Sequence, residues 1–305
     1  MKILNFGSIN IDLIFRVDHI VAPKETISSS SLVQSSGGKG ANQSVAVAKC
    51  SLAEIYHAGL IGPEGLWLKE KLNSYNVDTT YIKQIEEPTG QAIIQLDKKG
   101  QNSIVLYGGA NQKFTKKWID EVLEDFPANN WIMIQNETNH LDYIIDKAKE
   151  KNHKICFNPA PFDNSFFSLP INKIDLLIVN EIEAEQAIGE SGVVVALNQL
   201  ANKYQGTTIV ITCGSDGVLY SANGKTGTFG TWKVPVVDTT AAGDTFIGYF
   251  LASYLKYDDI DKAIELASRA SNITIMNKGA IDTIPTLNQL DQVDSYPYTP
   301  SPFNL

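Results

Sequence analysis

A regular alternation of short apolar runs with longer amphipathic segments most constrains how this chain can fold. The apolar runs lie at Ile3 to Phe6, Ile55 to Leu60, Trp131 to Gln135, Lys154 to Phe157, Leu176 to Val179 and Thr208 to Thr212. Segments with apolar residues at helical spacing lie between them, at Leu66 to Tyr75, Lys117 to Phe126, Leu141 to Lys151 and Leu197 to Tyr204. Strands that alternate with helices usually form a parallel sheet covered by helices on both faces. The sequence therefore predicts an α/β fold.

Two stretches interrupt this alternation. Residues from about 11 to 36 contain strand-like pieces and little helix, and residues from about 89 to 110 have the pattern of a hairpin, with Lys98-Lys99-Gly100 at its turn. We expect both to form a small β layer outside the main sheet, although edge strands of the main sheet would fit the same pattern. No linker or repeat divides the 305 residues, so we expect a single domain over 1–305.

The segment 237–244, with the sequence VDTTAAGD, is the strongest functional signal. The valine-rich stretch Val234 to Val237 is expected to enter it as a buried strand, and an amphipathic helix is expected to leave it. Small side chains let an anion approach the unpaired N–H groups at a helix start. Asp244 would stand there as an acceptor for a proton. A plain strand-to-helix turn with a capping Asp is the alternative.

A second cluster, Gly37-Gly38-Lys39-Gly40-Ala41-Asn42, follows a strand-like stretch and precedes a helix expected from about Asn42 to Lys49. It is neither a Walker A loop nor a dinucleotide fingerprint, because the required spacing is absent. Glycines at this density allow a polar ligand to approach the backbone. Lys39 and Asn42 could then hydrogen-bond hydroxyl groups. A flexible glycine loop is the competing interpretation.

Acidic residues at two strand ends add to these clusters. Asn180 and Glu183 stand three apart at the start of an expected helix, which is the pattern of a capping box. Glu137 follows the strand that ends at Gln135. Ligands in open α/β sheets bind at the carboxyl ends of the strands, so Glu137 lies where a ligand contact is expected. A solvated loop carboxylate is the alternative for Glu137.

Charge and cysteine content exclude several classes of partner. The formal net charge is −9 and the pI is near 5.0, without a Lys/Arg-rich block, so we expect no nucleic-acid partner. No apolar run approaches the ~18 residues of a membrane span. Cys50, Cys156 and Cys213 are odd in number and widely spaced, which favours reduced thiols and a cytoplasmic location.

These segments together resemble the ribokinase family of sugar kinases, also called the phosphofructokinase-B type. The resemblance extends to about Pro285 and includes five ordered matches: GSINID at Gly7 to Asp12, GGKGAN at Gly37 to Asn42, NEIE at Asn180 to Glu183, TCGSDG at Thr212 to Gly217, and DTTAAGD at Asp238 to Asp244. The resemblance implies a ribokinase-like fold in which the small β layer is a lid over the sugar and the contact of a homodimer.

The resemblance also implies a role for each candidate residue. Asp244 would be the general base, and the N–H groups of Ala241, Ala242 and Gly243 would stabilise the transferred phosphoryl group. The sugar would be held by Asn10, Asp12, Gly38, Lys39, Asn42, Glu137 and Asp244. ATP would be bound by Asn180, Glu183, Thr212, Gly214, Ser215, Gly217, Gly243 and Ser268, with Asn180 and Glu183 organising Mg²⁺. A K⁺ site would be formed by Asp238, Thr240, Thr274, Asn277, Gly279 and Thr283.

Two departures from the family pattern affect the K⁺ site, because Asn277 replaces the usual Arg and Asp282 replaces a common Pro. A plain helix end from Asn277 to Gly279 is the alternative there. The expected reaction is ATP-dependent phosphorylation of D-ribose at its terminal hydroxyl. A kinase of the same fold acting on fructose, deoxyribose or a nucleoside is the nearest rival. A non-catalytic sugar-binding protein is disfavoured, since it would need no base at Asp244.

Overall fold

A nine-stranded sheet forms the centre of the computed structural model, which describes residues 1–305. Its strand order is β13-β12-β11-β10-β9-β8-β1-β4-β5, and all neighbouring strands from β11 to β5 are parallel. The strands are β1 (Lys2–Phe6), β4 (Glu54–Ile61), β5 (Ile82–Gln84), β8 (Trp131–Gln135), β9 (Lys154–Asn158), β10 (Leu176–Asn180), β11 (Thr208–Thr212), β12 (Val218–Ala222) and β13 (Lys225–Phe229). The predicted α/β fold is therefore confirmed.

Helices cover both faces of this sheet, because alternate side chains of each buried strand point to opposite sides. Ile3 packs in one apolar core with α1, α2, α7 and α8, while Leu4 packs in a second core with α3 to α6. The helices are α1 (Lys39–Cys50), α2 (Leu66–Ser74), α3 (Lys116–Asp125), α4 (Leu141–Glu150), α5 (Glu181–Ile188), α6 (Val193–Lys203), α7 (Ala242–Tyr257) and α8 (Ile260–Ile275).

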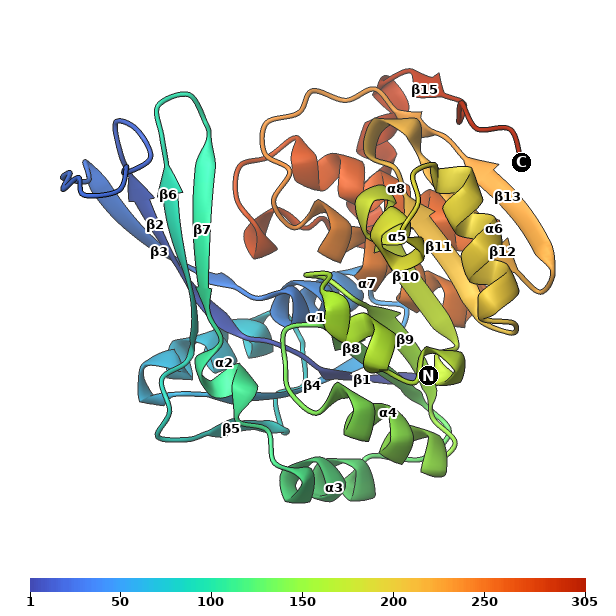
Figure 1. The fold of residues 1–305 in the computed structure, drawn as a ribbon, viewed down its shortest axis with the longest axis horizontal. Coiled ribbons are helices and arrows are strands. Elements are labelled where there is room, and N and C mark those ends of the chain that lie inside the picture. The colour runs from blue at the N-terminus through green and yellow to red at the C-terminus, as the bar shows by residue number, and fades with distance from the viewer.

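The two irregular stretches form a separate four-stranded sheet, in the order β3-β2-β6-β7, that projects from one side of the molecule (Figure 1). Its strands are β2 (Asn10–Arg16), β3 (Ser31–Gly37), β6 (Gly90–Leu96) and β7 (Asn102–Tyr107). The β2–β6 pair is parallel and the other two pairs are antiparallel. The predicted β layer is confirmed, and these strands are not edge strands of the main sheet.

Shorter elements complete the chain. Two-residue strands β14 (Thr231–Trp232) and β15 (Tyr298–Thr299) pair near the C-terminus. The 3-10 turns are η1 (Pro63–Gly65), η2 (Gly109–Gln112), η3 (Asn164–Ser168), η4 (Ile171–Lys173), η5 (Gly214–Asp216), η6 (Ile281–Thr283) and η7 (Leu287–Ser295). No helix has the combination of length and apolar character that a membrane span requires.

One predicted strand is wrong. The stretch Val234 to Val237 is not a strand, and Val236 and Val237 are 63% and 60% exposed. Pro235 has no N–H to donate to a sheet ladder, so the stretch is a poor central strand despite its valines. It instead runs outside the sheet from β14 toward α7, and the Val237 N–H donates to the Ile275 carbonyl.

Candidate active site

The start of α7 has the features of an anion-binding turn. Ala241 is its N-cap residue and has a left-handed backbone with φ 61°, a conformation that costs a non-glycine residue about 1–3 kcal/mol. The N–H groups of Gly243 and Asp244 have no hydrogen-bond partner within the protein, whereas that of Ala242 donates to the Thr239 carbonyl at 3.2 Å. Open space adjoins Gly243. The turn thus presents free donors at the positive end of a helix dipole.

Asp244 lies in the first turn of α7 and is only 8% exposed. Its carboxylate accepts two hydrogen bonds from α1, one from Asn42 Nδ2 to Oδ2 and one from Gln43 Nε2 to Oδ1, both at 2.9 Å. These donors reach it because α1 and α7 cross closely at Gly248, where a Cβ would stand 2.4 Å from the Cβ of Ala46. Neutral donors on both oxygens stabilise the ionised carboxylate that a general base requires.

The glycine cluster is ordered and forms the start of α1. The helix begins at Lys39, earlier than the expected Asn42, and Gly38 is its N-cap residue. A Cβ on Gly37 would lie 2.1 Å from a carboxylate oxygen of Asp12, so glycine is needed for that carboxylate to pack here. The flexible-loop interpretation is therefore wrong, and the cluster holds Lys39 and Asn42 in place.

Two carboxylates and an amide lie beside this helix start. Asp12 comes from β2, and burial, followed by the charge of Glu137, raises its pKa to about 7. Glu137 accepts hydrogen bonds from the Ser8 hydroxyl and, at 3.0 Å, from the Lys39 N–H. Asn10 is held through its Oδ1 by Asn111 Nδ2 at 2.7 Å. Glu137 is thus part of this cluster and not a solvated loop carboxylate.

Electrostatic balance explains how three acids are accommodated near one cation. Burial lowers the pKa of Lys39, but the charges of Asp244, Glu137 and Glu183 outweigh it, so the pKa of Lys39 is raised overall. Burial raises the pKa of Glu137 and of Glu183, while the charge of Lys39 lowers both. Lys39 therefore remains charged, and its charge offsets that of the nearby carboxylates.

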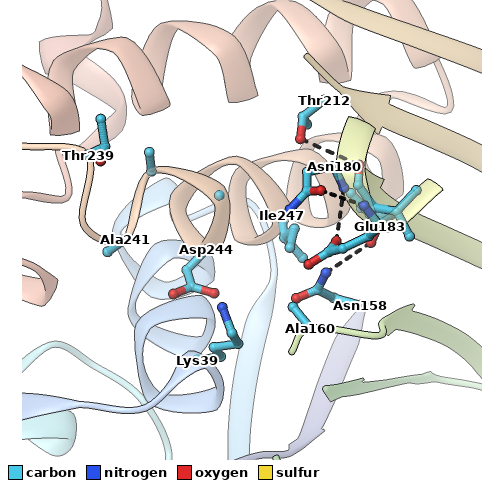
Figure 2. Close-up of a pocket in the computed structure, with 14 residues that line it drawn as sticks. Lys39, Asn158, Ala160, Asn180, Glu183, Thr212, Thr239, Ala241, Asp244 and Ile247 are labelled. Atoms are coloured by element: carbon cyan, nitrogen blue, oxygen red, sulfur yellow. Dashed lines mark hydrogen bonds between the residues drawn. The ribbon is translucent and has the colours of Figure 1, made fainter. Parts of the chain in front are cut away.

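A cavity of about 250 Å³ is lined by Lys39, Asp244 and Glu183, whereas the predicted sugar residues Asn10, Asp12, Gly38, Asn42 and Glu137 do not line it. Figure 2 shows Lys39 directed into it beside Asp244, with Asn180, Glu183 and Thr212 on the opposite wall. Its lining is formed by Lys39, Asn158, Ala160, Ile178, Val179, Asn180, Glu183, Thr212, Thr239, Ala241, Ala242, Gly243, Asp244 and Ile247. The cavity lies at the carboxyl ends of parallel strands, where α/β sheets bind ligands.

Asn180 and Glu183 form the predicted capping box of α5. The Asn180 N–H donates to Glu183 Oε2 at 3.0 Å, and the Glu183 N–H donates to Asn180 Oδ1 at 2.8 Å. Both residues also line the cavity, so capping and ligand contact are compatible. Of the other predicted nucleotide residues, Thr212 and Gly243 line the cavity as well. Gly214, Ser215, Gly217 and Ser268 do not, and Ser268 is a buried residue of α8.

The residues of the predicted K⁺ site lie on the loop before α7, in the last turn of α8 and in the segment after α8, and their side chains are mostly engaged in local hydrogen bonds. Asp238 accepts from the Thr240 N–H at 3.0 Å and from the Gly279 N–H at 3.1 Å. The Thr274 hydroxyl lies 3.1 Å from the Ala270 carbonyl. In the same way, the side chains of Asn277 and Thr283 donate to the carbonyls of Ile273 and Ala280. Backbone carbonyl oxygens of these segments would suit a weakly hydrated cation, and the helix-end alternative fits equally.

Sequence reasoning missed the polar residues that support the site. Gln43 contacts Asp244 directly, Asn111 holds Asn10, and Ser8 holds Glu137. Gln43 and Gln135 are both fully buried. A glutamine at the end of the apolar run that finishes at Gln135 was a visible signal, because a buried amide needs partners.

The fold and the site fit an enzyme that moves a phosphoryl group onto a hydroxyl, because a buried carboxylate and free helix N–H groups line one cavity. Comparison with known proteins supports this class. A family model described as pfkB family carbohydrate kinase matches residues 1–287. The chain therefore belongs to the pfkB family of carbohydrate kinases, and it is an ATP-dependent sugar kinase.

Individual relatives are similar over nearly the whole chain. A ribokinase of Haemophilus influenzae is 35% identical over 292 residues, which cover 92% of this chain and 94% of that protein. A ribokinase of Staphylococcus aureus is 33% identical over 310 residues, covering 96% and 99%. The crystal structure of ribokinase from Cryptococcus neoformans in complex with ADP has a TM-score of 0.84 at 33% identity, covering 95% of this chain and 99% of that chain.

Proposed function

We propose that this protein transfers the terminal phosphoryl group of ATP to the terminal (5-) hydroxyl of D-ribose, with Asp244 as general base. The observation that carries the proposal is the position of Asp244, buried, held by two amides and facing the same cavity as Lys39 and the free Gly243 N–H. The names of the similar proteins favour ribose over fructose, deoxyribose or a nucleoside.

The residues around Asp244 divide into sugar-holding and charge-holding groups. The carboxylates and amides of the lid side suit a sugar with several adjacent hydroxyls, and these residues are Asn10, Asp12, Gly38, Lys39, Asn42 and Glu137. Asp244 accepts the proton of the attacking hydroxyl. The N–H groups of Ala241 and Gly243 face the oxygens of the transferred phosphoryl group, and that of Ala242 joins them by releasing the Thr239 carbonyl. Lys39 offsets the charge of this group. Catalysis is then mainly positioning and electrostatic stabilisation.

The opposite wall of the cavity fits a nucleotide with its metal. Asn180 and Glu183 place an amide and a carboxylate there, the oxygen ligands and water acceptors that Mg²⁺ favours. Mg²⁺ bound with ATP neutralises phosphate charge. Thr212 belongs to this wall, and Gly214, Ser215 and Gly217 would extend the nucleotide side beyond the cavity. The loops at Asp238–Thr240 and Thr274–Thr283 would hold K⁺ through carbonyl oxygens and keep the α7 turn in place.

A homodimer through the lid and a cytoplasmic location are further parts of this proposal. The lid sheet has exposed apolar side chains on both faces, with Val33, Ile104 and Leu106 on one face and Leu32, Ile93 and Val105 on the other. A partner would cover one of these faces. The three cysteines are buried and free, in keeping with a reducing compartment.

The test is an ATP-dependent phosphorylation screen over D-ribose, 2-deoxyribose, fructose and adenosine, with initial rates measured at several sugar concentrations. We expect the highest kcat/KM for ribose, and an Asp244→Asn variant that still binds ribose but hardly turns over. Faster phosphorylation of another acceptor would assign this site to that substrate instead.

A further inference from the structure

A continuous chain of buried polar side chains lies behind the base, and its members do not line the cavity. They come from four separate elements, β1, α1, β4 and β8, and each is 0% exposed: Asn5, Gln43, Ser44, His57 and Gln135. Buried polar groups without a ligand contact are costly unless their hydrogen bonds are satisfied. This hydrogen-bonded chain of side chains therefore needs a structural or functional explanation.

The hydrogen bonds of this chain lead to Asp244. Gln43 Nε2 donates to Asp244 Oδ1 at 2.9 Å, and Gln43 Oε1 accepts from Gln135 Nε2 at 2.7 Å. Gln135 Nε2 also donates to Asn5 Oδ1 at 3.1 Å. Asn5 Nδ2 in turn donates to the Gly40 carbonyl at 2.8 Å. Three amides thus connect a backbone carbonyl to the base.

The carbonyl of Gly40 fixes the direction of every bond in this chain, because a carbonyl can only accept. Asn5 must turn its nitrogen toward that carbonyl, so its oxygen faces Gln135. Gln135 must then present its nitrogen to both oxygens beside it, including that of Gln43. The nitrogen of Gln43 is left facing Asp244. A reversed Gln43 would place an amide oxygen against a carboxylate.

A second branch of the chain ends in the same way. Asn5 Nδ2 also donates to Ser44 Oγ at 2.8 Å, and Ser44 Oγ lies 2.8 Å from His57 Nδ1. His57 Nε2 is 3.1 Å from the Gly7 carbonyl, so Nε2 carries the hydrogen and Nδ1 accepts from Ser44. Burial lowers the pKa of His57 to about 4, so the ring is neutral and has one N–H. Both branches are anchored on backbone carbonyls.

We propose that Gln43 is a positioning residue for the base Asp244, and that Gln135 and Asn5 impose its orientation. Asn158 Oδ1, which accepts from Gln43 Nε2 at 3.3 Å, supports the same orientation. This inference rests on the proposed role of Asp244. Asn42 is the other donor to Asp244. Its buried Oδ1 has no partner, so no hydrogen bond to that oxygen fixes its amide as Gln135 fixes the amide of Gln43. The oriented Gln43 donor stabilises the ionised carboxylate and holds its rotamer, leaving the remaining lone pairs for the sugar hydroxyl.

Gln43→Met removes the donor at similar side-chain length. Losing a hydrogen bond to a charged group typically costs about 10- to 100-fold. We expect this loss in kcat, with the KM for sugar changed less than about threefold. The acid limb of the pH profile of kcat should move to higher pH, because the ionised form of Asp244 loses a donor. A residue that only fills space would leave that limb in place.

Gln135→Met tests the orientation itself, since Gln135 touches neither Asp244 nor the cavity. It removes the donor to Gln43 Oε1 but leaves the contact of Gln43 Nε2 with Asn158 Oδ1 at 3.3 Å, so the amide is held less firmly. We therefore expect the same two changes at a smaller size, about 3- to 10-fold in kcat. Thr207→Val is the matched control. It removes a buried hydrogen bond to the Ile174 carbonyl at 2.8 Å that has no connection with the base, and kcat and the acid limb should stay unchanged.

A double-mutant cycle in urea unfolding separates this proposal from the proposed function. Gln43→Met and Asp244→Asn should be coupled by at least about tenfold in the unfolding equilibrium constant, whereas Thr207→Val and Asp244→Asn should not be. If the wild type phosphorylated no sugar, the function would fail and this coupling would still decide the inference. An uncoupled cycle, or a Gln43→Met enzyme with wild-type kcat and acid limb, would overturn it.

Discussion

Replacing Asp12 with Asn should change how the stability of the ligand-free protein depends on pH. Burial, with the charge of Glu137 as a smaller cause, raises the pKa of Asp12 from 3.8 to about 7 in the folded protein. The folded state therefore binds a proton over a pH range in which the unfolded state has released it. The free energy that Asp12 contributes to folding is fully present below pH 3.8 and is lost as the pH rises through about 7.

The size of this effect follows from the two pKa values. Each pKa unit corresponds to 1.36 kcal/mol, so the whole contribution is at most about 4 kcal/mol. Asp12 is not fully buried, so screening by water makes the actual contribution smaller than this upper limit. Asn at position 12 does not titrate. Its unfolding free energy relative to the wild type should therefore rise by about 2 kcal/mol between pH 5 and pH 8.

The assay is urea unfolding of the wild type and Asp12→Asn without ligands, followed by fluorescence at half-unit pH steps. Asp18→Asn is the matched control, because the hydrogen bond and charge of Lys98 lower the pKa of Asp18 below the tested range. The Asp18→Asn difference should be flat from pH 5 to pH 8. An equally flat difference for Asp12→Asn would refute the argument that burial and the charge of Glu137 raise the pKa of Asp12 in the folded protein.

Three further predictions concern activity. Asp244→Asn should lower kcat by about 10²–10⁴-fold with ribose binding retained, as rates and calorimetric titrations would measure, and a normal kcat would remove Asp244 as the base. Ribose should be preferred to 2-deoxyribose and both to adenosine, since each polar group left unpaired costs about 1–3 kcal/mol, and faster adenosine phosphorylation in the screen would reject this preference. KCl at constant ionic strength should stimulate the initial rate more than NaCl does without being essential. A flat KCl response would leave the segment from Asn277 to Gly279 as a plain helix end.

Local sequence was sufficient wherever neighbouring residues define the structure. The alternation of apolar runs with amphipathic segments predicted the layers of the fold, and the hairpin pattern around Lys98 predicted the lid. The turn before Asp244 and the capping box at Asn180 were also found, because their hydrogen bonds lie within a few residues of the chain. Family resemblance added roles to these residues, but the local physics already placed them at helix starts.

The tertiary structure decided which distant groups meet. Gln43 and Asp244 are 201 residues apart and touch because α1 crosses α7 at Gly248. The raised pKa of Asp12 depends first on burial and then on a Glu137 brought in from another strand end. The valines before Asp238 favour a strand, yet the path of the chain left them exposed. A sequence sets secondary-structure propensities and hydrogen bonds between residues that are close in the chain. Burial, and the amide orientation that it forces on Gln43, exist only after the helices and the sheet have packed together.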